Sequence, residues 1–310
     1  MSQHSYDYDV VVIGGGGAGL TAALYTSRAK LSTLLLEKLT PGGQIALTDI
    51  VENYPGFPEG ITGPEISQRM EEQAKKYGTE ILYQEVKSLA KKNGGFELKT
   101  EEGAYRAKTL ILASGASFRT LGVAGEKELT GRGVSYCATC DGAFFKEKEI
   151  IVVGGGDSAM QEGIFLTRFA SKLTVVHRRD KLRASPILQE RAKQNSKIKF
   201  LWDTVVEKIQ GSKKVEGVVL KNLKTGQATA FRTDGVFVFV GHDPNTAFLK
   251  GFVALDEKAY VKTGASLKTS VAGVFAAGEV RSGAVKQLVS ACGEGCEAAL
   301  EAQAYLEHSL

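Results

Sequence analysis

The sequence predicts an α/β fold of two parallel-sheet domains, with the second domain inserted into the first. The order strand, glycine loop, helix and strand occurs twice, at 9–37 and 149–177. Each copy is a βαβ unit, the building block of a parallel sheet. Two stretches rich in small or turn-forming residues, 114–119 and 241–247, mark two crossings between the domains. The length of 310 residues agrees with two domains.

Apolar periodicity and turn residues place the individual elements along the chain. In the first copy we expect strands at 9–13 and 32–37 around a helix at about 18–29. In the second copy the expected strands are 149–153 and 172–177, around a helix at about 157–169. The remaining expected elements are a helix at about 63–77, antiparallel strands at 79–90, 95–100 and 104–107, strands at 199–209, 214–223, 227–232, 235–240 and 273–277, and a closing helix at about 284–307.

Composition points to a cytoplasmic protein that binds neither nucleic acid nor membrane. The net charge of +4 is small for this length. No run approaches the roughly 18 apolar residues that a membrane span needs. The N-terminal segment carries acids where a signal peptide would carry basic residues.

The first glycine loop reads Gly14-x-Gly16-x-x-Gly19, between an apolar strand and a helix. Glycine here permits a tight turn, a close approach of backbone to pyrophosphate and close packing of helix on strand. The helix N-terminus adds free N–H groups for the phosphates. Glu37 ends the second strand, near the position of a carboxylate that binds ribose hydroxyls. We therefore expect a dinucleotide with a free 2′-hydroxyl, as in FAD or NAD, rather than a purely structural turn.

The second loop reads Gly154-x-Gly156-x-x-Ala159, with alanine as the permitted third residue. At the position of Glu37, a basic cluster replaces the acid. A carboxylate would repel a 2′-phosphate, whereas arginine binds one through paired hydrogen bonds. Such bonds contribute roughly 1.5–3 kcal/mol each, which favours NADP over NAD. In isolation the cluster would be a solvated charged turn, but its position after the second strand favours a phosphate site. It consists of His177, Arg178, Arg179 and Arg183.

One chain therefore combines two predicted nucleotide sites with opposite charge at the ribose position. Two soluble nicotinamides in one protein would be unusual. FAD at the first loop and NADPH at the second is the chemically consistent pair, because a flavin accepts hydride from NADPH.

Cys137 and Cys140 form a CxxC pair just before the second βαβ unit. Cytosolic thiols are mostly reduced, so a structural disulfide framework is not expected. A zinc site would need two more ligands, for which Cys292 and Cys296 are candidates, and it would leave both glycine loops unexplained. Inert buried thiols would leave the CxxC spacing unexplained. We interpret the pair as a redox dithiol and expect no metal.

Seven segments carry a resemblance to a known family. In chain order they are GGGGAGLTAALYTSRA, ENYPGF, CATCDGAFF, GGGDSAMQEG, HRRDKLRAS, VGHDPNT and VFAAGEV. They are similar, in sequence and order, to the bacterial-type low-molecular-weight thioredoxin reductases, which are class II pyridine nucleotide-disulfide oxidoreductases. The resemblance covers nearly the whole chain. Its most specific segments are CATCDGAFF and HRRDKLRA, because relatives without a dithiol or with another electron donor lose them.

The resemblance implies two Rossmann-like domains of three β/β/α layers. It implies an FAD-binding domain at 1–116 and 245–310, and an inserted NADPH-binding domain at 117–244 that carries the dithiol. NADPH would reduce FAD, FAD would reduce the Cys137–Cys140 disulfide, and the dithiol would reduce oxidised thioredoxin. The resemblance further implies a homodimer, and a rotation of the inserted domain about the two crossings.

Carried over by position, the resemblance assigns roles to single residues. Cys140 is the thiol next to the flavin, Cys137 is the interchange thiol that attacks the substrate, and Asp141 is the acid–base group. Further contacts are expected at Gln44, Asn53, Glu279 and Gln287 for FAD, and at Ser158 for the pyrophosphate of NADPH.

Three positions depart from the family pattern. Glu279 stands in place of an aspartate that contacts the flavin, Lys286 in place of an arginine, and Ala113-Ser114-Gly115 in place of Ala-Thr-Gly. The first two changes are expected to affect the flavin region, and none affects the dithiol or the basic cluster.

Several alternatives remain at this point. The electron acceptor could be another small disulfide carrier, such as a glutaredoxin, a peroxiredoxin or a specialised thioredoxin. A flavin-binding redox sensor without turnover is a further alternative, but it predicts a degraded dithiol or NADPH loop. His242 is expected to be structural. We expect Cys292 and Cys296 to pack in the core beside Val285, Leu288 and Val289.

Overall fold

The computed structural model describes residues 6–47 and 50–308, without the side chains of Leu47, Thr139 and Cys140. The chain divides into two compact units. Unit 1 comprises Met1–Ser117 and Asp243–Leu310, and unit 2 comprises Phe118–His242. The segments that connect them contain two short strands, β9 (Ala116–Phe118) and β18 (His242–Pro244), which pair with each other. The predicted α/β class, with one unit inserted into the other, is confirmed.

Unit 1 is built on a seven-stranded sheet. Its strands are β1 (Tyr8–Ile13), β2 (Thr33–Leu36), β5 (Glu80–Leu82), β6 (Ser88–Lys92), β7 (Gly95–Lys99), β8 (Ala104–Leu112) and β19 (Val274–Ala276). The order is β5-β2-β1-β8-β7-β6, with β19 paired to β8. The strands β5, β2, β1, β8 and β19 are mutually parallel, whereas β7 and β6 continue the sheet in antiparallel fashion.

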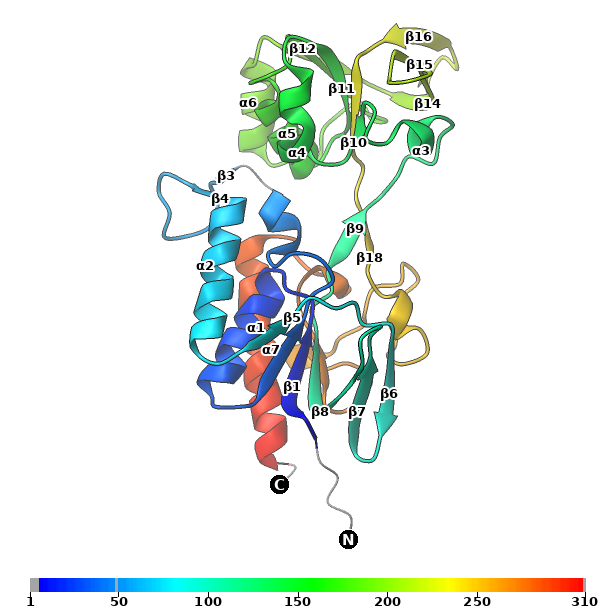
Figure 1. Cartoon of the computed structure of the whole chain (residues 1–310). Helices are drawn as coiled ribbons and strands as arrows, with labels where there is room; N and C mark the ends of the chain where they lie inside the picture. The colour runs from blue at the N-terminus through cyan, green and yellow to red at the C-terminus, as the bar shows by residue number, and fades with distance from the viewer. Residues whose placement is uncertain (1–5, 48–49, 309–310) are drawn as a thin grey trace. The chain divides into compact units, whose positions relative to one another are not determined.

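Helices cover one face of this sheet (Figure 1). They are α1 (Gly17–Arg28), α2 (Gly63–Lys76) and α7 (Leu288–His308). Val10 and Val12 of β1 pack into the core on the helical side, and the alternate residues Val11 and Ile13 pack into a second core on the other face. Successive strand residues point to opposite faces, so β1 is buried on both, as expected for a covered parallel sheet.

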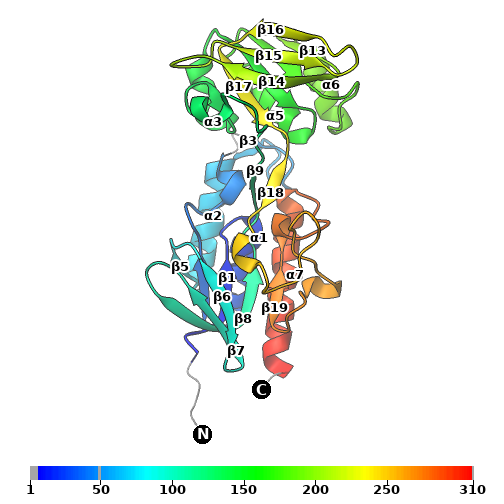
Figure 2. The same cartoon turned by 90° about the vertical axis from the view of Figure 1, so that its right-hand side faces the viewer.

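Unit 2 has three layers. The central layer is a parallel sheet of order β10-β17-β11-β12-β13, with bounds β10 (Val134–Ser135), β11 (Glu149–Gly154), β12 (Lys172–Val176), β13 (Ile198–Leu201) and β17 (Gly235–Phe239). Helices α5 (Asp157–Leu166) and α6 (Pro186–Gln194) lie on one side of it (Figure 1). An antiparallel sheet lies on the other side (Figure 2) and consists of β14 (Thr204–Gln210), β15 (Gly217–Asn222) and β16 (Ala228–Arg232).

The remaining elements are short. They are β3 (Ile50–Val51), β4 (Ile61–Thr62), α3 (Glu126–Leu129), α4 (Ala138–Asp141) and the 3-10 turns η1 (Gly43–Leu47), η2 (Gly142–Phe145), η3 (Ala247–Leu249), η4 (Ala265–Leu267) and η5 (Gly278–Val280). Among the residues described, no helix has the length and apolar character that crossing a bilayer requires.

Both predicted βαβ units are confirmed, as β1-α1-β2 and β11-α5-β12. Three other predictions were wrong. The stretch 79–90 was expected to be antiparallel, but β5 pairs in parallel with β2 because it follows the helix α2. The stretch 199–209 is two strands in different sheets, separated at Asp203, which has a positive φ of 51°. The last helix begins at Leu288 rather than 284, since Lys286 has φ 62°.

Candidate functional site

The first glycine loop lies between β1 and α1 and depends on glycine for its packing. A Cβ on Gly14 would lie 2.3 Å from the carbonyl oxygen of Ala113, and one on Gly19 would lie 1.8 Å from that of Gly14. At Gly16, by contrast, a Cβ would meet nothing within 4 Å. The loop is therefore closed toward the sheet and open at Gly16, which fits the close approach of a pyrophosphate.

Glu37 is fixed beside this loop. Its Oε2 accepts a hydrogen bond from Gly15 N at 2.7 Å, and its Oε1 accepts one from Leu39 N at 2.9 Å. Its own backbone N–H donates to Leu82 O at 3.0 Å and extends the pairing of β2 with β5. A carboxylate oxygen has two lone pairs, so each oxygen keeps a position for a ribose hydroxyl.

The four other predicted flavin-contacting residues form two hydrogen-bonded pairs in unit 1. Gln44 Nε2 donates to Glu279 Oε2 at 2.9 Å and also to Ala116 O at 2.9 Å. Asn53 Nδ2 donates to Gln287 Oε1 at 2.9 Å. Each pair joins an early segment of the chain to a late one, which fits a flavin site built from both parts of unit 1. Glu279, one of the departures from the family pattern, reaches Gln44 with its longer side chain.

A largely buried ion pair behind Glu279, between Arg281 and Glu294, was not predicted from the sequence. Glu294 of α7 accepts from Gly278 N at 2.7 Å and from Arg281 Nε at 2.8 Å, and it also pairs with Arg281 Nη2. The side chains of this ion pair are only 18% and 11% exposed, for Arg281 and Glu294 respectively. The pair holds η5, and therefore Glu279, against the last helix. The sequence offered no distinguishing signal, because α7 carries four glutamates, of which Glu294 is only the first.

The second glycine loop repeats the first in unit 2. Gly154 has φ 150°, and a Cβ there would lie 2.3 Å from Phe239 O. A Cβ on Gly156 would meet nothing within 4 Å, so this loop is also open at its middle glycine. Ala159 is fully buried, so the third loop position accepts a methyl group here. The open loop fits the pyrophosphate of a second nucleotide.

His177 occupies the place that Glu37 has in the first copy, but its side chain is buried. Only 4% of it is exposed, and a Cβ on Gly155 would lie 2.3 Å from its ring. The ring Nε2 lies 3.1 Å from Lys181 O. Burial lowers the pKa of His177, and the neighbouring arginines act in the same direction. The neutral ring therefore supports the loop from behind, and its contact with a nucleotide stays a prediction.

The other predicted NADPH residues face solvent. Arg178, Arg179, Arg183 and Ser158 are all exposed. The segment that carries the arginines returns to the glycine loop, where Arg183 N and Ala184 N both donate to Gly155 O, at 2.7 and 3.2 Å. The structure thus brings the basic segment and the second loop together, as the sequence predicts.

Cys137 lies just before α4 and is disulfide-bonded. The side chain of its predicted partner, Cys140, lies outside the described residues. A disulfide-bonded Cys137 cannot also be a thiolate ligand of zinc, so this bond favours the redox interpretation. Asp141 N donates to Cys137 O at 3.3 Å, and the Asp141 side chain is half-buried.

The backbone of Cys137 is held by a serine that sequence analysis did not identify. Ser135 Oγ accepts from Cys137 N and donates to Cys137 O, both at 3.1 Å. Ser135 is 2% exposed. The next residue, Tyr136, donates to Glu126 Oε1 at 2.7 Å. Burial and this hydrogen bond raise the pKa of Tyr136. The dithiol segment is therefore anchored within unit 2.

The two remaining cysteines are free thiols in α7. Cys292 is buried and packs with Leu288, as expected, and burial raises the pKa of its thiol. Cys296 is half-buried. The expected packing beside Val285 and Val289 was wrong, because these side chains are 66% and 45% exposed. The late start of α7 leaves Val285 outside the helix.

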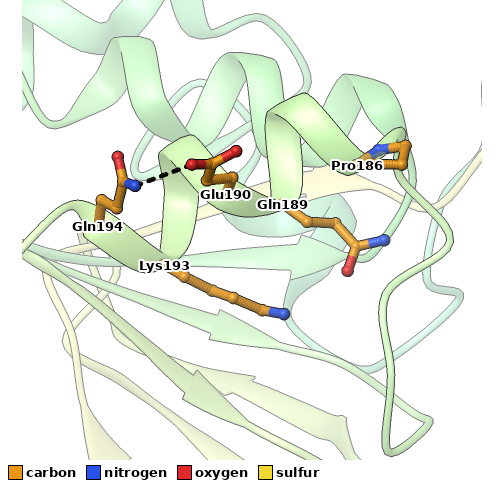
Figure 3. A pocket seen from close by; sticks show the side chains of 5 residues that line it. All are labelled: Pro186, Gln189, Glu190, Lys193 and Gln194. Carbon is orange, nitrogen blue, oxygen red and sulfur yellow. Dashed lines mark hydrogen bonds between the residues drawn. The ribbon is translucent and has the colours of Figure 1, made fainter.

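A surface hollow follows α6 and is lined by Pro186, Gln189, Glu190, Lys193 and Gln194 (Figure 3). Glu190 there accepts a hydrogen bond from Gln194 at 3.1 Å. The hollow gathers no nucleophile or metal-ligating cluster among its lining residues. Its one link to the site is Gln189, whose Nε2 donates to Ala184 O at 2.8 Å and so supports the end of the arginine segment.

Comparison with known proteins agrees with this geometry. The model of the pyridine nucleotide-disulphide oxidoreductase family matches residues 8–295. The thioredoxin reductase of Bacillus subtilis (strain 168) is 51% identical over 301 residues, which are 97% of this chain and 95% of that protein.

Solved structures agree as well. The crystal structure of Lactococcus lactis thioredoxin reductase (FR conformation) superimposes with a TM-score of 0.95 at 45% identity, covering 97% of this chain and all 100% of that one. For the thioredoxin reductase of T. acidophilum the TM-score is 0.93 at 38% identity, covering 99% of this chain and 100% of that one. The chain therefore belongs to the pyridine nucleotide-disulphide oxidoreductase family, among the thioredoxin reductases.

Proposed function

We propose that this chain is an NADPH-dependent thioredoxin-disulfide reductase in which Cys137 and Cys140 pass electrons to oxidised thioredoxin. The observation that carries the proposal is the disulfide-bonded Cys137 within the unit that holds the second glycine loop and the basic segment. Relatives that are named thioredoxin reductase along nearly their whole length support the same activity.

The cofactors are FAD and NADPH. When bound, they supply hydride transfer from nicotinamide to flavin and the two-electron reduction of a disulfide. Unit 1 would hold FAD through the first glycine loop and the acid beside it, and unit 2 would hold NADPH through the second loop and its arginines. The remaining FAD-holding residues are Gln44, Asn53, Glu279 and Gln287.

The reduced dithiol transfers its electrons by thiol–disulfide exchange. The Cys137 thiolate attacks one sulfur of the substrate disulfide, which forms a mixed disulfide and releases one substrate thiolate. The Cys140 thiolate then attacks the Cys137 sulfur, which restores the Cys137–Cys140 disulfide and releases the second thiolate. Asp141 carries the proton that converts a departing thiolate to a thiol. Ser135 keeps the Cys137 backbone in place throughout.

The dithiol and the NADPH residues both belong to unit 2, so they cannot serve one flavin face at the same time. We infer that unit 2 rotates between two arrangements about β9 and β18, since hinges fall in a few residues between elements. A cytoplasmic location and a homodimer complete the proposal.

The direct test is an anaerobic titration of the purified yellow protein with NADPH, with and without thioredoxin. We expect the flavin absorbance to bleach, and NADPH oxidation to continue only while oxidised thioredoxin remains. Cys137→Ser and Cys140→Ser should each abolish thioredoxin turnover and leave flavin reduction by NADPH intact. Turnover that persists in either variant would contradict the roles of these cysteines.

A reductase for another small disulfide carrier would share the same core. Parallel assays with thioredoxin, glutaredoxin and a peroxiredoxin separate these alternatives by kcat/KM. A higher kcat/KM for glutaredoxin or peroxiredoxin than for thioredoxin would reassign the carrier and leave the dithiol chemistry unchanged.

A further inference from the structure

We propose that Asp157 is a positioning residue that sets the selectivity of unit 2 for a nucleotide 2′-phosphate. It does so by fixing the arginine segment 178–183 to the second glycine loop. This inference rests on the proposed NADPH site, and it assigns a role to a residue that need not touch the nucleotide.

Three successive backbone amides anchor the end of the arginine segment. Arg183 N and Ala184 N donate to Gly155 O, and Ser185 N donates to Asp157 Oδ1 at 2.6 Å. The last bond is the shortest of the three and the only one whose acceptor is a side-chain carboxyl group, and because it is exposed, solvent weakens it relative to a buried bond of this kind. Asp157, together with Gln189 on Ala184 O, is therefore a side chain that fixes the backbone directly after Arg183.

The start of the segment is held by other contacts. His177 is buried against Gly155, its Nε2 lies near Lys181 O, and Asp203 N donates to Arg179 O at 3.3 Å. The segment is thus fixed at both ends to the loop that would hold the pyrophosphate. The anchored backbone fixes the points from which the exposed arginine side chains extend, which reduces the number of arrangements they must search to bind a phosphate.

Asp157 stands in the first turn of α5, where the positive end of the helix dipole favours a carboxylate, but the loop beside it is assigned to a pyrophosphate, which a carboxylate repels. In the first copy the same position is Gly17, and the acid beside that loop is Glu37. In the second copy the acid is thus absent from the end of the second strand, where the 2′-position is expected, and stands at the start of α5, where it binds Ser185 after the arginine segment. That placement favours arginine at the 2′-position.

The test compares NADP⁺ with NAD⁺, which differ only in the 2′-phosphate, by calorimetric titration of the oxidised holoenzyme. In Asp157→Ala we expect NADP⁺ affinity to fall about tenfold, which is about 1.4 kcal/mol, while NAD⁺ affinity stays the same or rises. Asp157→Asn keeps an acceptor oxygen and should retain most of the selectivity. The ratio of kcat/KM for NADPH over NADH should fall in parallel in Asp157→Ala.

Two further variants make the result decisive. Ser185 has φ −57°, which suits proline, so Ser185→Pro removes the donor N–H while Asp157 remains, and it should lose the same selectivity. Asp234 is the matched control, because its Oδ2 accepts from Glu149 N at 3.1 Å at the start of β11, at the other end of the strand from the loop. Asp234→Ala should leave the NADP⁺/NAD⁺ ratio unchanged.

Unchanged NADP⁺ affinity in Asp157→Ala would overturn the inference. So would an equal loss for NADP⁺ and NAD⁺, since that result indicates a general disturbance of the loop. If Asp157→Ala does not fold, Ser185→Pro decides by the same criteria. A wild-type protein that does not prefer NADP⁺ would instead reject the proposed NADPH site itself, which keeps the two failures distinct.

Discussion

The two glycine loops share one backbone plan and differ in the residues that anchor it. In each copy the residue after the second strand packs against the residue between the first two motif glycines, Gly15 or Gly155. In each copy the chain then returns and donates to that glycine's carbonyl, from Gly42 N at 2.6 Å in unit 1 and from Arg183 N at 2.7 Å in unit 2. The packing residue is Glu37 in the first copy and His177 in the second.

This comparison separates what builds a nucleotide site from what selects the nucleotide. The strand, the loop and the helix start form the same open cradle in both copies, because Gly16 and Gly156 each leave the space beside them free. In the proposed sites, charge selectivity would depend on the residue after the second strand and on the segment that then returns to the loop. The scaffold therefore predicts binding of a dinucleotide, and the anchors predict which one.

The largest expected difference between the copies concerns the third loop position. A Cβ on Gly19 would lie 1.8 Å from Gly14 O, a backbone atom that cannot move aside, whereas unit 2 already holds a buried methyl group at Ala159. We expect Gly19→Ala to cost about 3 kcal/mol or more of stability and to leave the protein without bound flavin. Ala159→Gly, the mirror change, should cost about 1 kcal/mol and retain NADPH binding. The ratio of flavin to protein absorbance measures bound flavin, and thermal unfolding measures the stability of each variant. Equal losses in the two variants would contradict the expected difference between the two loops.

The second prediction concerns the exposed arginines. Replacement of Arg178 and Arg179 by alanine should weaken NADPH binding about 100-fold. Each charged hydrogen bond to phosphate contributes roughly 1.5–3 kcal/mol, and exposure to solvent reduces this contribution. NADH binding should change little. The kcat/KM for each nucleotide in flavin reduction measures the effect, with Lys221→Ala on the antiparallel sheet as a surface-charge control. Equal losses for NADPH and NADH would reject the 2′-phosphate role.

The third prediction concerns Gly15 and Gly155, the residues between the first two motif glycines of each loop. A Cβ on Gly155 would lie 2.3 Å from the buried His177 ring, whereas a Cβ on Gly15 would lie 3.3 Å from Glu37. Gly155→Ala should therefore cost about 1–3 kcal/mol and weaken NADPH, while Gly15→Ala should be milder. Chemical unfolding of the two variants side by side tests this order. A reversed order would show that His177 has room to move.

The two glycine loops and the helices that follow them could be predicted from the sequence, because the glycine motifs are local in the chain. Gly14 and Gly154 are favoured by a positive φ, and Gly19 by its contact with the Gly14 carbonyl, and both reasons act within a few residues. The same holds for the boundaries of α1 and α5, which follow directly from these loops. The hydrogen bond between Gln44 and Glu279 was not predicted: the resemblance gave both only as flavin contacts, and 235 residues separate them in sequence.

What the sequence did not predict depends on contacts between distant segments. Nothing in the residue pattern of Asp157 indicates that it accepts a bond from Ser185, and α6 was not predicted at all, although Ser185-Pro186 is a typical helix start. The burial of His177 was also not predicted, because a histidine followed by two arginines suggests a solvated turn. These contacts arise from how the return segment folds back on the loop.

The smallest expected effect is a pH dependence of the second copy through its packing residue, His177. Burial lowers the pKa of His177, so the unfolded chain takes up a proton at this residue before the folded chain does. The contribution of the neutral His177 ring to the free energy of unfolding of unit 2 should therefore be fully present above about pH 6.5. It should decline as the pH falls below that value, down to the folded-state pKa.

Trp202, the single tryptophan, lies in the same unit with its ring centroid 6.3 Å from that of His177, so its fluorescence reports unfolding there. His177→Asn removes the titrating group, and the difference in unfolding midpoint between pH 7.5 and 5.5 should shrink in this variant. An identical difference in both proteins would mean that the ring titrates equally in the folded and unfolded states, and that its burial does not distinguish the second loop from the first.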